Sequence, residues 1–231
     1  MRNRLLLAFI SLLGLTSCLK DSPAYQEVAS ATALNAVPGS HSLIIGLDQN
    51  QLNHQVYGER FAYKDILPYK AAYPNRRHVR VFDPMSIVDP KPLAEAYVEF
   101  AAGNYYTLYL VGNDTKEIIY TQDDLSIPDE GKAKIRFINL SPDASALDLV
   151  YSNAADSVLA TNKAFKTYTA FKEVSTGQNL SFHIKDHASG RVMKSFTFNP
   201  QSGRVYTIWA RGLTALSADP KVTFEEGIIT H

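Results

Sequence analysis

The chain has 231 residues, with 23 basic and 23 acidic side chains that gather into no basic stripe. This balance argues against a nucleic-acid-binding protein, and the length suits one large domain or two small ones. The 13 Tyr and 11 Phe residues, together with Val, Ile and Thr, are typical of half-buried sheet surfaces. Because few segments repeat apolar residues at helical spacing, the sequence predicts an all-β protein.

Residues 1–17 have the organisation of a lipoprotein signal peptide. Two arginines precede an apolar run over residues 5–15, which is shorter than the roughly 20 residues of a membrane-spanning helix. The segment Leu15-Thr16-Ser17-Cys18 matches the bacterial lipobox, in which the cysteine becomes the lipidated N-terminus of the mature protein. We therefore expect a lipid anchor on Cys18. The alternative is an ordinary signal peptide followed by a chance cysteine.

The expected lipid has consequences for thiol chemistry and for location. Cys18 is the only cysteine, so the mature fold has no second thiol with which to form a disulfide. Residues 18–30 are predicted to be the lipidated cysteine and a polar tether. Leu19, rather than an aspartate, follows Cys18, and this favours the outer membrane of a bacterium, on either its periplasmic or its surface side.

The body of the chain contains a repeat. Residues 103–112 and 203–212 share Gly, Tyr, Thr, an aliphatic residue and a second Gly at the same offsets. Further pairs follow in the same order along the chain: Leu34-Asn35 with Ile138-Asn139, Tyr69-Lys70 with Phe171-Lys172, 78–83 with 180–186, 98–100 with 196–198, and 118–120 with 222–224. Each unit thus offers about seven short strands separated by turn residues, as in an immunoglobulin-like β-sandwich.

The predicted organisation is therefore two tandem immunoglobulin-like β-sandwich domains after a lipoprotein signal peptide. The first repeat, which is divergent, covers residues 31–126, and the second covers residues 133–231. Residues 121–132 are rich in acidic residues and are predicted to form the polar connection between the units. Residues 83–92 are rich in proline, which cannot donate to a sheet ladder, so they are predicted to lie outside the central strands.

The start of the second unit carries a resemblance to a known family. Residues 135–149 combine an apolar strand, a Ser-Pro-Asp-Ala turn and an alternating strand with an aspartate. This pattern resembles the opening of the bacterial domain-of-unknown-function 4397 family (DUF4397), and the similarity continues to about residue 215. The resemblance implies an immunoglobulin-like sandwich, often in tandem, on secreted or anchored envelope proteins, with no established catalytic residues. The first unit departs from it, since residues 37–40 read Val-Pro-Gly-Ser.

Signals of catalysis are sparse. The sequence has no Gly-x-Ser-x-Gly elbow, no phosphate-binding glycine loop and no His-Glu-x-x-His helix. Ser141 fits a strand-connecting turn, in which the side chains of Ser141 and Asp143 cap nearby backbone amides. We therefore predict a protein without catalytic or cofactor-binding residues.

Two groups of residues resemble metal ligands only in part. His183 and His187, with Asp186, lack the third or fourth ligand that a zinc site needs, and surface histidines are the simpler interpretation. The acidic pairs at 123–124 and 129–130 lack the spaced ligands of a calcium loop, so we interpret them as a solvated linker. The sequence therefore predicts no metal-ligating residues.

Aromatic residues of the repeated strand provide the candidate binding surface. Side chains alternate along a strand, so residues 106, 108 and 110 share one face, as do residues 206, 208 and 210. If these faces form the cores, then Tyr105, Tyr109 and Trp209 point outward. Outward aromatics can stack on sugar rings or form contacts with a protein. The alternative is that they pack against the neighbouring unit.

Two hypotheses for function come from different classes. The first is a non-catalytic, lipid-anchored envelope protein whose tandem sandwich modules mediate protein or matrix interaction. The alternative is a glycan-binding accessory lipoprotein that uses the outward aromatics, and a hydrolase with paired carboxylates is a distant third. The expected partners are a membrane, reached through the N-terminal lipid anchor, and an envelope protein or saccharide. No nucleic acid and no cofactor are expected.

Overall fold

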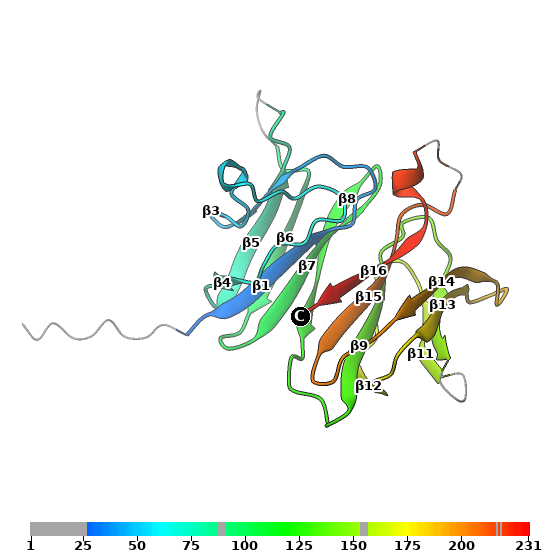
Figure 1. Ribbon diagram of the computed structural model, residues 1–231. Coiled ribbons are helices and arrows are strands. Elements are labelled where there is room, and N and C mark those ends of the chain that lie inside the picture. The colour runs from blue at the N-terminus through cyan, green and yellow to red at the C-terminus, as the bar shows by residue number, and fades with distance from the viewer. Residues whose placement is uncertain (1–26, 87–90, 153–156, 216, 218) are drawn as a thin grey trace, which may run out of the picture.

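The computed structural model describes residues 27–86, 91–152, 157–215, 217 and 219–231, and it shows two β-sandwich units (Figure 1). The prediction of an all-β protein with two tandem sandwiches is confirmed. Cys18 and the predicted leader lie outside the described residues. Among the helices that are described, none has the length and apolar character needed to cross a membrane.

Unit 1 contains eight strands within the described ranges. They are β1 (Ala29–Asn35), β2 (Ile44–Leu47), β3 (Asn50–Gln51), β4 (Lys70–Ala72), β5 (Asn75–Phe82), β6 (Ala94–Phe100), β7 (Tyr105–Gly112) and β8 (Lys116–Asp123). An outer sheet has the order β3-β2-β5-β6, and a facing sheet has the order β4-β1-β7-β8. In the facing sheet β1 and β7 are parallel. A 3-10 turn, η2 (Gln55–Tyr57), lies between β3 and β4.

Unit 2 repeats this arrangement strand by strand. Its strands are β9 (Lys132–Asn139), β10 (Leu147–Ser152), β11 (Ser157–Lys163), β12 (Lys172–Ser175), β13 (Leu180–Asp186), β14 (Val192–Phe198), β15 (Val205–Arg211) and β16 (Glu225–Thr230). The outer sheet has the order β11-β10-β13-β14 and the facing sheet has the order β12-β9-β15-β16. Each order is that of unit 1 with eight added to every strand number, and β9 and β15 are again parallel. The structure thus carries the repeat that the sequence predicts.

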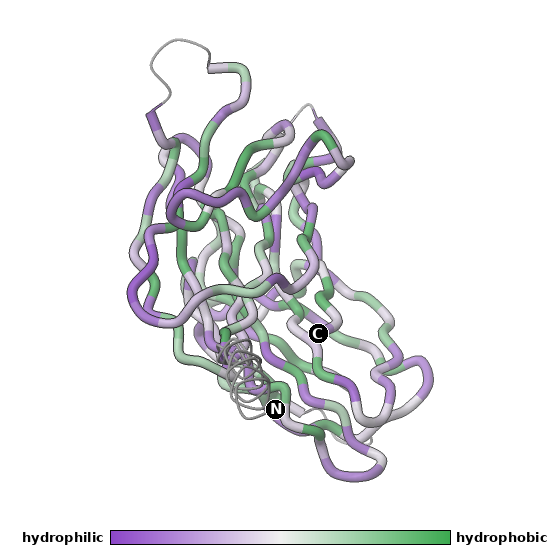
Figure 2. Tube along the Cα trace, turned by 90° about the vertical axis from the view of Figure 1, so that its left-hand side faces the viewer, coloured by the Kyte–Doolittle hydropathy of each residue, from purple (hydrophilic) through white to green (hydrophobic). Residues whose placement is uncertain are grey.

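Each unit has its own apolar core between its two sheets. In unit 1, Tyr106, Leu108 and Leu110 join this core, and the residues at 206, 208 and 210 do the same in unit 2. The predicted inward face of the repeated strand is therefore correct. Figure 2 shows hydrophobic stretches along the strands of both units and mostly hydrophilic loops at the periphery.

Steric contacts explain why both units have glycine at the last position of the repeated motif. Gly112 and Gly212 adopt positive φ angles of 106° and 79°, where side chains are disfavoured. A Cβ on Gly112 would lie 2.0 Å from the Thr115 oxygen, and one on Gly212 would lie 2.2 Å from the Thr223 oxygen. Both positions therefore require glycine at the end of the central strand.

The units pack through their facing sheets, so four sheets lie in layers. A third apolar cluster draws on β1 and β7 of unit 1 and on β9, β15 and β16 of unit 2. Figure 1 shows the facing sheets of the two units next to each other, with β16, an edge strand of the facing sheet of unit 2, on the side of unit 1. Strand β7 is buried at every position except its first residue. That pattern arises because one face of β7 meets the core of unit 1 and the other meets unit 2.

Three predicted boundaries differ from the structure. Strand β1 begins at Ala29, inside the segment predicted as tether, and β8 continues to Asp123, inside the predicted connection. The apolar stretch 222–224 does not form the closing strand of unit 2. Residues 220–222 form the 3-10 turn η3, and the strand is β16.

Candidate functional site

The outward face of the repeated strand lies in the interface between the units. Tyr109 has no exposed surface and Trp209 keeps only 2%. Both belong to the cluster between the facing sheets, together with Leu34, Ile138 and Ile229. The prediction that Tyr109 and Trp209 point away from their own cores is correct, but they do not reach solvent. A binding surface built from Tyr105, Tyr109 and Trp209 is therefore wrong for two of its three residues. For Tyr109 and Trp209 the alternative, packing against the neighbouring unit, is confirmed.

Equivalent positions in this interface are filled by different pairs of side chains. Tyr109 pairs across the strands with Ile119, and Trp209 pairs with Gly227. A Cβ on Gly227 would lie 2.3 Å from the Trp209 indole ring. The larger indole thus lies over a position without a side chain, which keeps the packed volume of the two pairs similar.

Polar residues fill one region of the same interface, which we call the interface cluster: Tyr69, Thr107, Thr121, Asp123, Arg136, Thr207 and His231. Arg136 Nη2 lies 2.7 Å from Asp123 Oδ1, and the two side chains are 1% and 0% exposed. Asp123 also accepts hydrogen bonds from Thr107 at 2.6 Å, Thr121 at 3.1 Å and Tyr69 at 2.8 Å. This buried ion pair joins the last residue of β8 in unit 1 to β9 of unit 2.

The Arg136 guanidinium is also bonded to groups of both units. It donates to Thr207 Oγ1, to the Tyr109 hydroxyl at 3.0 Å and to the Gln122 carbonyl at 3.3 Å. Its central carbon lies 4.4 Å from the ring centre of Phe171. A buried charge is tolerated when it is paired and hydrogen-bonded, and Arg136 meets both conditions.

The hydrogen-bond partners assign a neutral tautomer to His231. Thr207 Oγ1 accepts from Arg136, so its proton goes to His231 Nε2, 2.8 Å away. Tyr69 donates to the Asp123 carboxylate, so its oxygen accepts from His231 Nδ1 at 2.8 Å. His231 therefore carries its proton on Nδ1.

Burial favours this neutral form of His231. Removal from water lowers the pKa of His231 to about 4; the Asp123 carboxylate opposes this shift, and Arg136 adds to it. Burial likewise raises the pKa of Tyr69 and Tyr109. At neutral pH the cluster holds one cation, one anion and neutral donors and acceptors, all bonded to one another.

The acidic connection between the units is not wholly a solvated linker. Asp123 ends β8 and is 4% exposed, so the prediction of a solvated residue is wrong there because the facing sheet of unit 2 covers it. Asp124 is exposed, accepts from Ser126 and Lys134, and these bonds hold its pKa at about 2. Glu130 is exposed as predicted.

The residues singled out for catalysis or metal binding have structural partners. Ser141 donates to the Gly212 carbonyl at 2.6 Å, and Asp143 accepts from the backbone of Thr214 at 2.8 Å. The turn is confirmed. Besides a bond from the Ser141 hydroxyl to Asp143 at 3.4 Å, its side chains bond to the loop after β15. His183 and His187 contact Ser195 and Asp148 separately. Throughout the described part of the chain, no three His, Cys, Asp or Glu side chains are placed to hold a metal ion.

A cleft opens at the side of unit 1, between the edge strands β3 and β4. Its volume is about 340 Å³. Buried Leu47 and Leu52 lie at its base, and the exposed residues around it include Asn50, Gln51 and Tyr73. We call this space the edge cleft.

Charged groups around the edge cleft are paired with each other. Lys70 Nζ lies 2.6 Å from Glu59 Oε2, and Arg77 Nη1 lies 3.3 Å from Asp48 Oδ2. The hydrogen bond from Lys70 lowers the pKa of Glu59, so Glu59 stays ionised at neutral pH. The lining thus carries Arg77 paired with Asp48, and Lys70 paired with Glu59, which is not itself part of the lining. His54 also belongs to the lining.

Tyr105, the third residue of the predicted binding surface, lies at a separate groove. It is 40% exposed and meets the Tyr69 ring edge-on at 5.6 Å. The groove also contains residues 122–126 and has a volume of about 630 Å³. Tyr105 is therefore accessible, but it lies apart from any wider aromatic platform because Tyr109 and Trp209 are buried.

Sequence reasoning missed both the interface cluster and the edge cleft. A signal for the first existed: Arg136 stands between Ile135 and Phe137 in an apolar strand, and a buried cation there requires an anion nearby. The edge cleft gave no comparable signal. Its residues come from separate parts of unit 1, and only folding brings β3 and β4 to the same side of the sandwich.

Comparison with family models gives one match. The model of the family described as "Domain of unknown function (DUF4397)" matches residues 29–150. The match covers unit 1, the repeat predicted to be divergent, and only the start of unit 2 as far as β10. The family is therefore the predicted one, but the matched residues differ from the predicted range of 133 to about 215. A search among curated proteins found no match.

Several solved structures share the β-rich architecture at low identity. A family 26 carbohydrate-binding module from Eubacterium rectale, solved with maltoheptaose, is 9% identical over 88% of this chain and 97% of that chain, with a TM-score of 0.28. A candidate cell adhesion protein from Bacteroides eggerthii is 9% identical over 90% and 96%, with a TM-score of 0.25. Streptococcal family 41 carbohydrate-binding modules are 11% identical over 78% and 92%, with a TM-score of 0.26. Similarity at this level carries no information about a ligand of this chain.

Proposed function

The chain belongs to the DUF4397 family, and from this premise we propose that it is a non-catalytic envelope protein, anchored by lipid on Cys18, whose two sandwich units mediate protein or matrix interaction. One observation carries the proposal. The buried ionic side chains Asp123 and Arg136 are bonded to each other across the interface between the units. They hold the two units together and are bonded to protein groups, so they support a structural role for these charges at the contact between the units.

The anchor is proposed from the leader and the lipobox. Residues 19–28 separate Cys18 from β1, and ten residues span at most about 35 Å when extended. One acyl chain binds a membrane only marginally, whereas several give stable anchoring. The proposed location is the outer membrane of a bacterium, with unit 1 held within this distance of the bilayer.

Mass spectrometry of the mature N-terminal peptide tests the anchor. We expect Cys18 to carry acyl groups and the protein to be found in the membrane fraction. The variant Cys18→Ser should lose the lipid and leave the membrane fraction, whereas the control Ser22→Ala keeps the lipobox and should retain both. An unmodified Cys18 at the mature N-terminus would contradict the proposal.

Crosslinking in intact cells tests the proposed interaction. A photoreactive residue would replace exposed Tyr73 or Tyr97 in unit 1, or Tyr168 in unit 2. We expect at least one position to capture the same envelope protein or matrix component in repeated experiments, with competition by excess unlabelled protein. Absence of capture from all three positions would contradict an interaction module.

The glycan-binding alternative loses the surface on which it was based. Tyr109 and Trp209 are buried, so a ligand cannot stack on them without separating the units. We therefore do not propose that Tyr105, Tyr109 and Trp209 together bind a glycan.

A further inference from the structure

We propose that the edge cleft of unit 1 binds a short, uncharged saccharide. The proposal rests on the proposed binding function for its setting, and it names a site and a ligand class that the interaction proposal leaves open. It uses none of the buried aromatics of the interface. Four properties of the cleft support it: its size, its paired charges, its free amides and an exposed aromatic ring.

The size and shape of the cleft suit a small ligand. Its volume of about 340 Å³ lies at the lower end of the range of about 300–1,000 Å³ for small-molecule sites. Leu47 and Leu52 provide an apolar base. The cleft is therefore amphipathic, as is a sugar ring, which has apolar C–H faces and a polar rim.

Charge pairing at the cleft argues for an uncharged ligand. Lys70 is bound to both carboxylate oxygens of Glu59, at 2.7 and 2.6 Å. Arg77 is bound to Asp48 and to the carbonyls of Tyr73 and Pro74. A charged ligand would have to displace one of these partners, at a cost that an uncharged ligand avoids.

Two amides at the cleft are uncommitted. Within the residues that the structure describes, the side chains of Asn50 and Gln51 have no hydrogen-bond partner in the protein, and both residues are exposed. Each amide offers two donors and one acceptor. Such groups match sugar hydroxyls, which also donate and accept.

Tyr73 provides an exposed ring on a turn whose backbone is held by hydrogen bonds. It is 53% exposed, and the Arg77 guanidinium lies 5.9 Å from its ring centre. Arg77 Nε donates to the Tyr73 carbonyl at 3.1 Å, and Nη2 donates to the Pro74 carbonyl at 2.7 Å. These contacts fix the turn between β4 and β5, so less conformational entropy is lost when a ligand packs on the ring.

The test measures binding of the full chain to short neutral oligosaccharides, including glucans, mannans, xylans and N-acetylglucosamine oligomers, with acidic oligosaccharides in a parallel arm. We expect at least one neutral saccharide to bind in calorimetry, with an affinity that stays within twofold between about 0.05 M and about 0.5 M salt, where charge interactions become screened. Amide chemical-shift changes should be confined to residues 47–54 and 70–77. No binding to any neutral saccharide, binding only to acidic ones, or shift changes elsewhere would each overturn the proposal.

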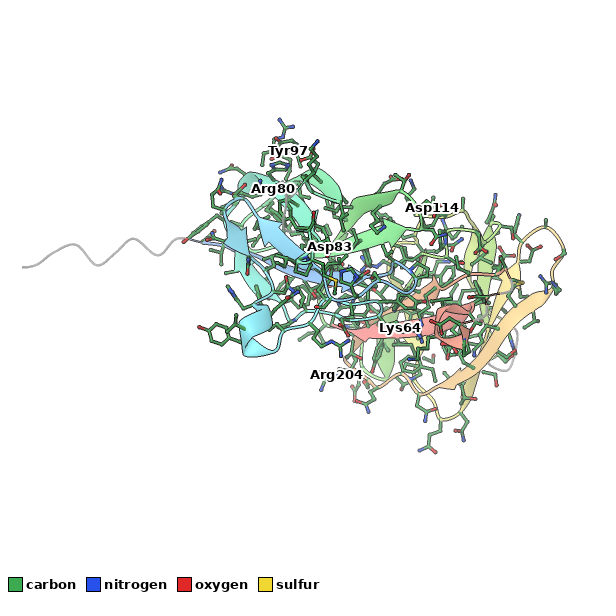
Figure 3. The ribbon with its side chains drawn as sticks, turned by 90° about the horizontal axis from the view of Figure 1, so that it is seen from above. Lys64, Arg80, Asp83, Tyr97, Asp114 and Arg204 are labelled. Atoms are coloured by element: carbon green, nitrogen blue, oxygen red, sulfur yellow. The ribbon has the colours of Figure 1, made fainter. Side chains whose placement is uncertain are left out.

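Variants with a matched control locate the site. Tyr73→Ala should weaken binding by about tenfold, as for a packed aromatic contact, and the double variant Asn50→Ala, Gln51→Ala should do likewise without removing a core residue. Tyr97→Ala is the control, because Tyr97 is 56% exposed on the outer sheet of the same unit (Figure 3). Equal losses in Tyr73→Ala and Tyr97→Ala would overturn the assignment.

The two proposals fail in distinguishable ways. An unlipidated Cys18 with saccharide binding intact would refute the anchor and leave the edge cleft assignment standing. A lipidated chain that captures an envelope protein but binds no neutral saccharide would support the anchor and the interaction module and refute the edge cleft assignment.

Discussion

The two units have the same fold, yet they place different residues at equivalent points of the interface between them. By strand register, Thr32 lies beside Thr107 in unit 1 and Arg136 lies beside Thr207 in unit 2. Likewise, Asp123 faces Tyr105 in unit 1, and His231 donates its backbone N–H to Val205, the equivalent residue of unit 2. Asp123 bonds Thr107 in unit 1, and His231 bonds the equivalent Thr207 in unit 2.

Because the two units differ at these positions, two units of the same fold can form one specific pair. The anion Asp123 belongs to unit 1 and its cation Arg136 belongs to unit 2. Two copies of unit 1 would place Asp123 opposite Thr32, which has no positive charge, and an unpaired buried carboxylate is costly. We infer that the interface selects unit 1 with unit 2 over like with like.

Removing the positive charge of Arg136 should reduce the stability of the paired units more than any other change considered below. Arg136→Met leaves Asp123 buried without its counter-charge, and breaking a buried pair in this way typically costs about 3–5 kcal/mol. Urea unfolding of the full chain should show this loss of stability. The control is the double variant Asp123→Asn, Arg136→Met, which removes both charges and should cost less than the single variant. A single variant as stable as the wild type would contradict the role of the pair.

Lowering the pH should reduce the stability of the protein through His231, which occupies in unit 2 the position that Asp123 occupies in unit 1. The pKa of His231 is about 4 in the folded protein and about 6.5 in an unfolded chain, so the unfolded state binds the proton more readily. The contribution of the neutral imidazole is therefore fully present above pH 6.5 and is lost as pH falls towards 4, by at most about 3 kcal/mol.

Stability measured across this range in the wild type and in His231→Gln tests the prediction. The variant retains a polar side chain but cannot titrate, so its stability should change less between pH 6.5 and pH 4. Carboxylates that lie away from position 231 contribute equally to both proteins. Identical pH profiles would show that His231 does not titrate in this way.

The packing pairs give a third test of the comparison. Gly227→Ala places a Cβ against the Trp209 indole, and such overpacking typically costs about 1–3 kcal/mol. The double variant Trp209→Tyr, Gly227→Ala moves unit 2 towards the Tyr109–Ile119 pair of unit 1. The double variant should lose less stability than the sum of the losses of the two single variants, because the two residues are in direct contact. Simple additivity in thermal or urea unfolding would contradict a shared volume.

The core faces were predictable from sequence because they depend on local alternation. In β7, residues 106, 108 and 110 alternate with the outward set, and the repeat at 206–210 does the same. The glycines at 112 and 212 were visible as a repeated motif for a related reason, since each is required by backbone of its own unit.

Contacts between the units were not predictable in the same way. Whether Tyr109 and Trp209 meet solvent depends on the partner sheet, which alternation within a strand does not reveal. One signal was present: residues 105–112 have aromatic or aliphatic side chains on both faces, as in a strand covered on both sides. The edge cleft likewise depends on two strand edges that are distant in sequence, β3 and β4.

The smallest effect is expected at the rim of the same interface, where charges also pair between the units. Lys166 Nζ lies 2.9 Å from Glu117 Oε2, and the two side chains are 34% and 50% exposed. A second rim pair, Lys64 with Glu225, has a separation of 4.0 Å, and Figure 3 shows Lys64 beside β16. Exposed pairs typically contribute less than about 1 kcal/mol and are weakened by salt. The variant Lys166→Ala should therefore shift the urea midpoint slightly at low salt and less at high salt. A loss as large as that of Arg136→Met would mean that the rim, and not the buried cluster, holds the units together.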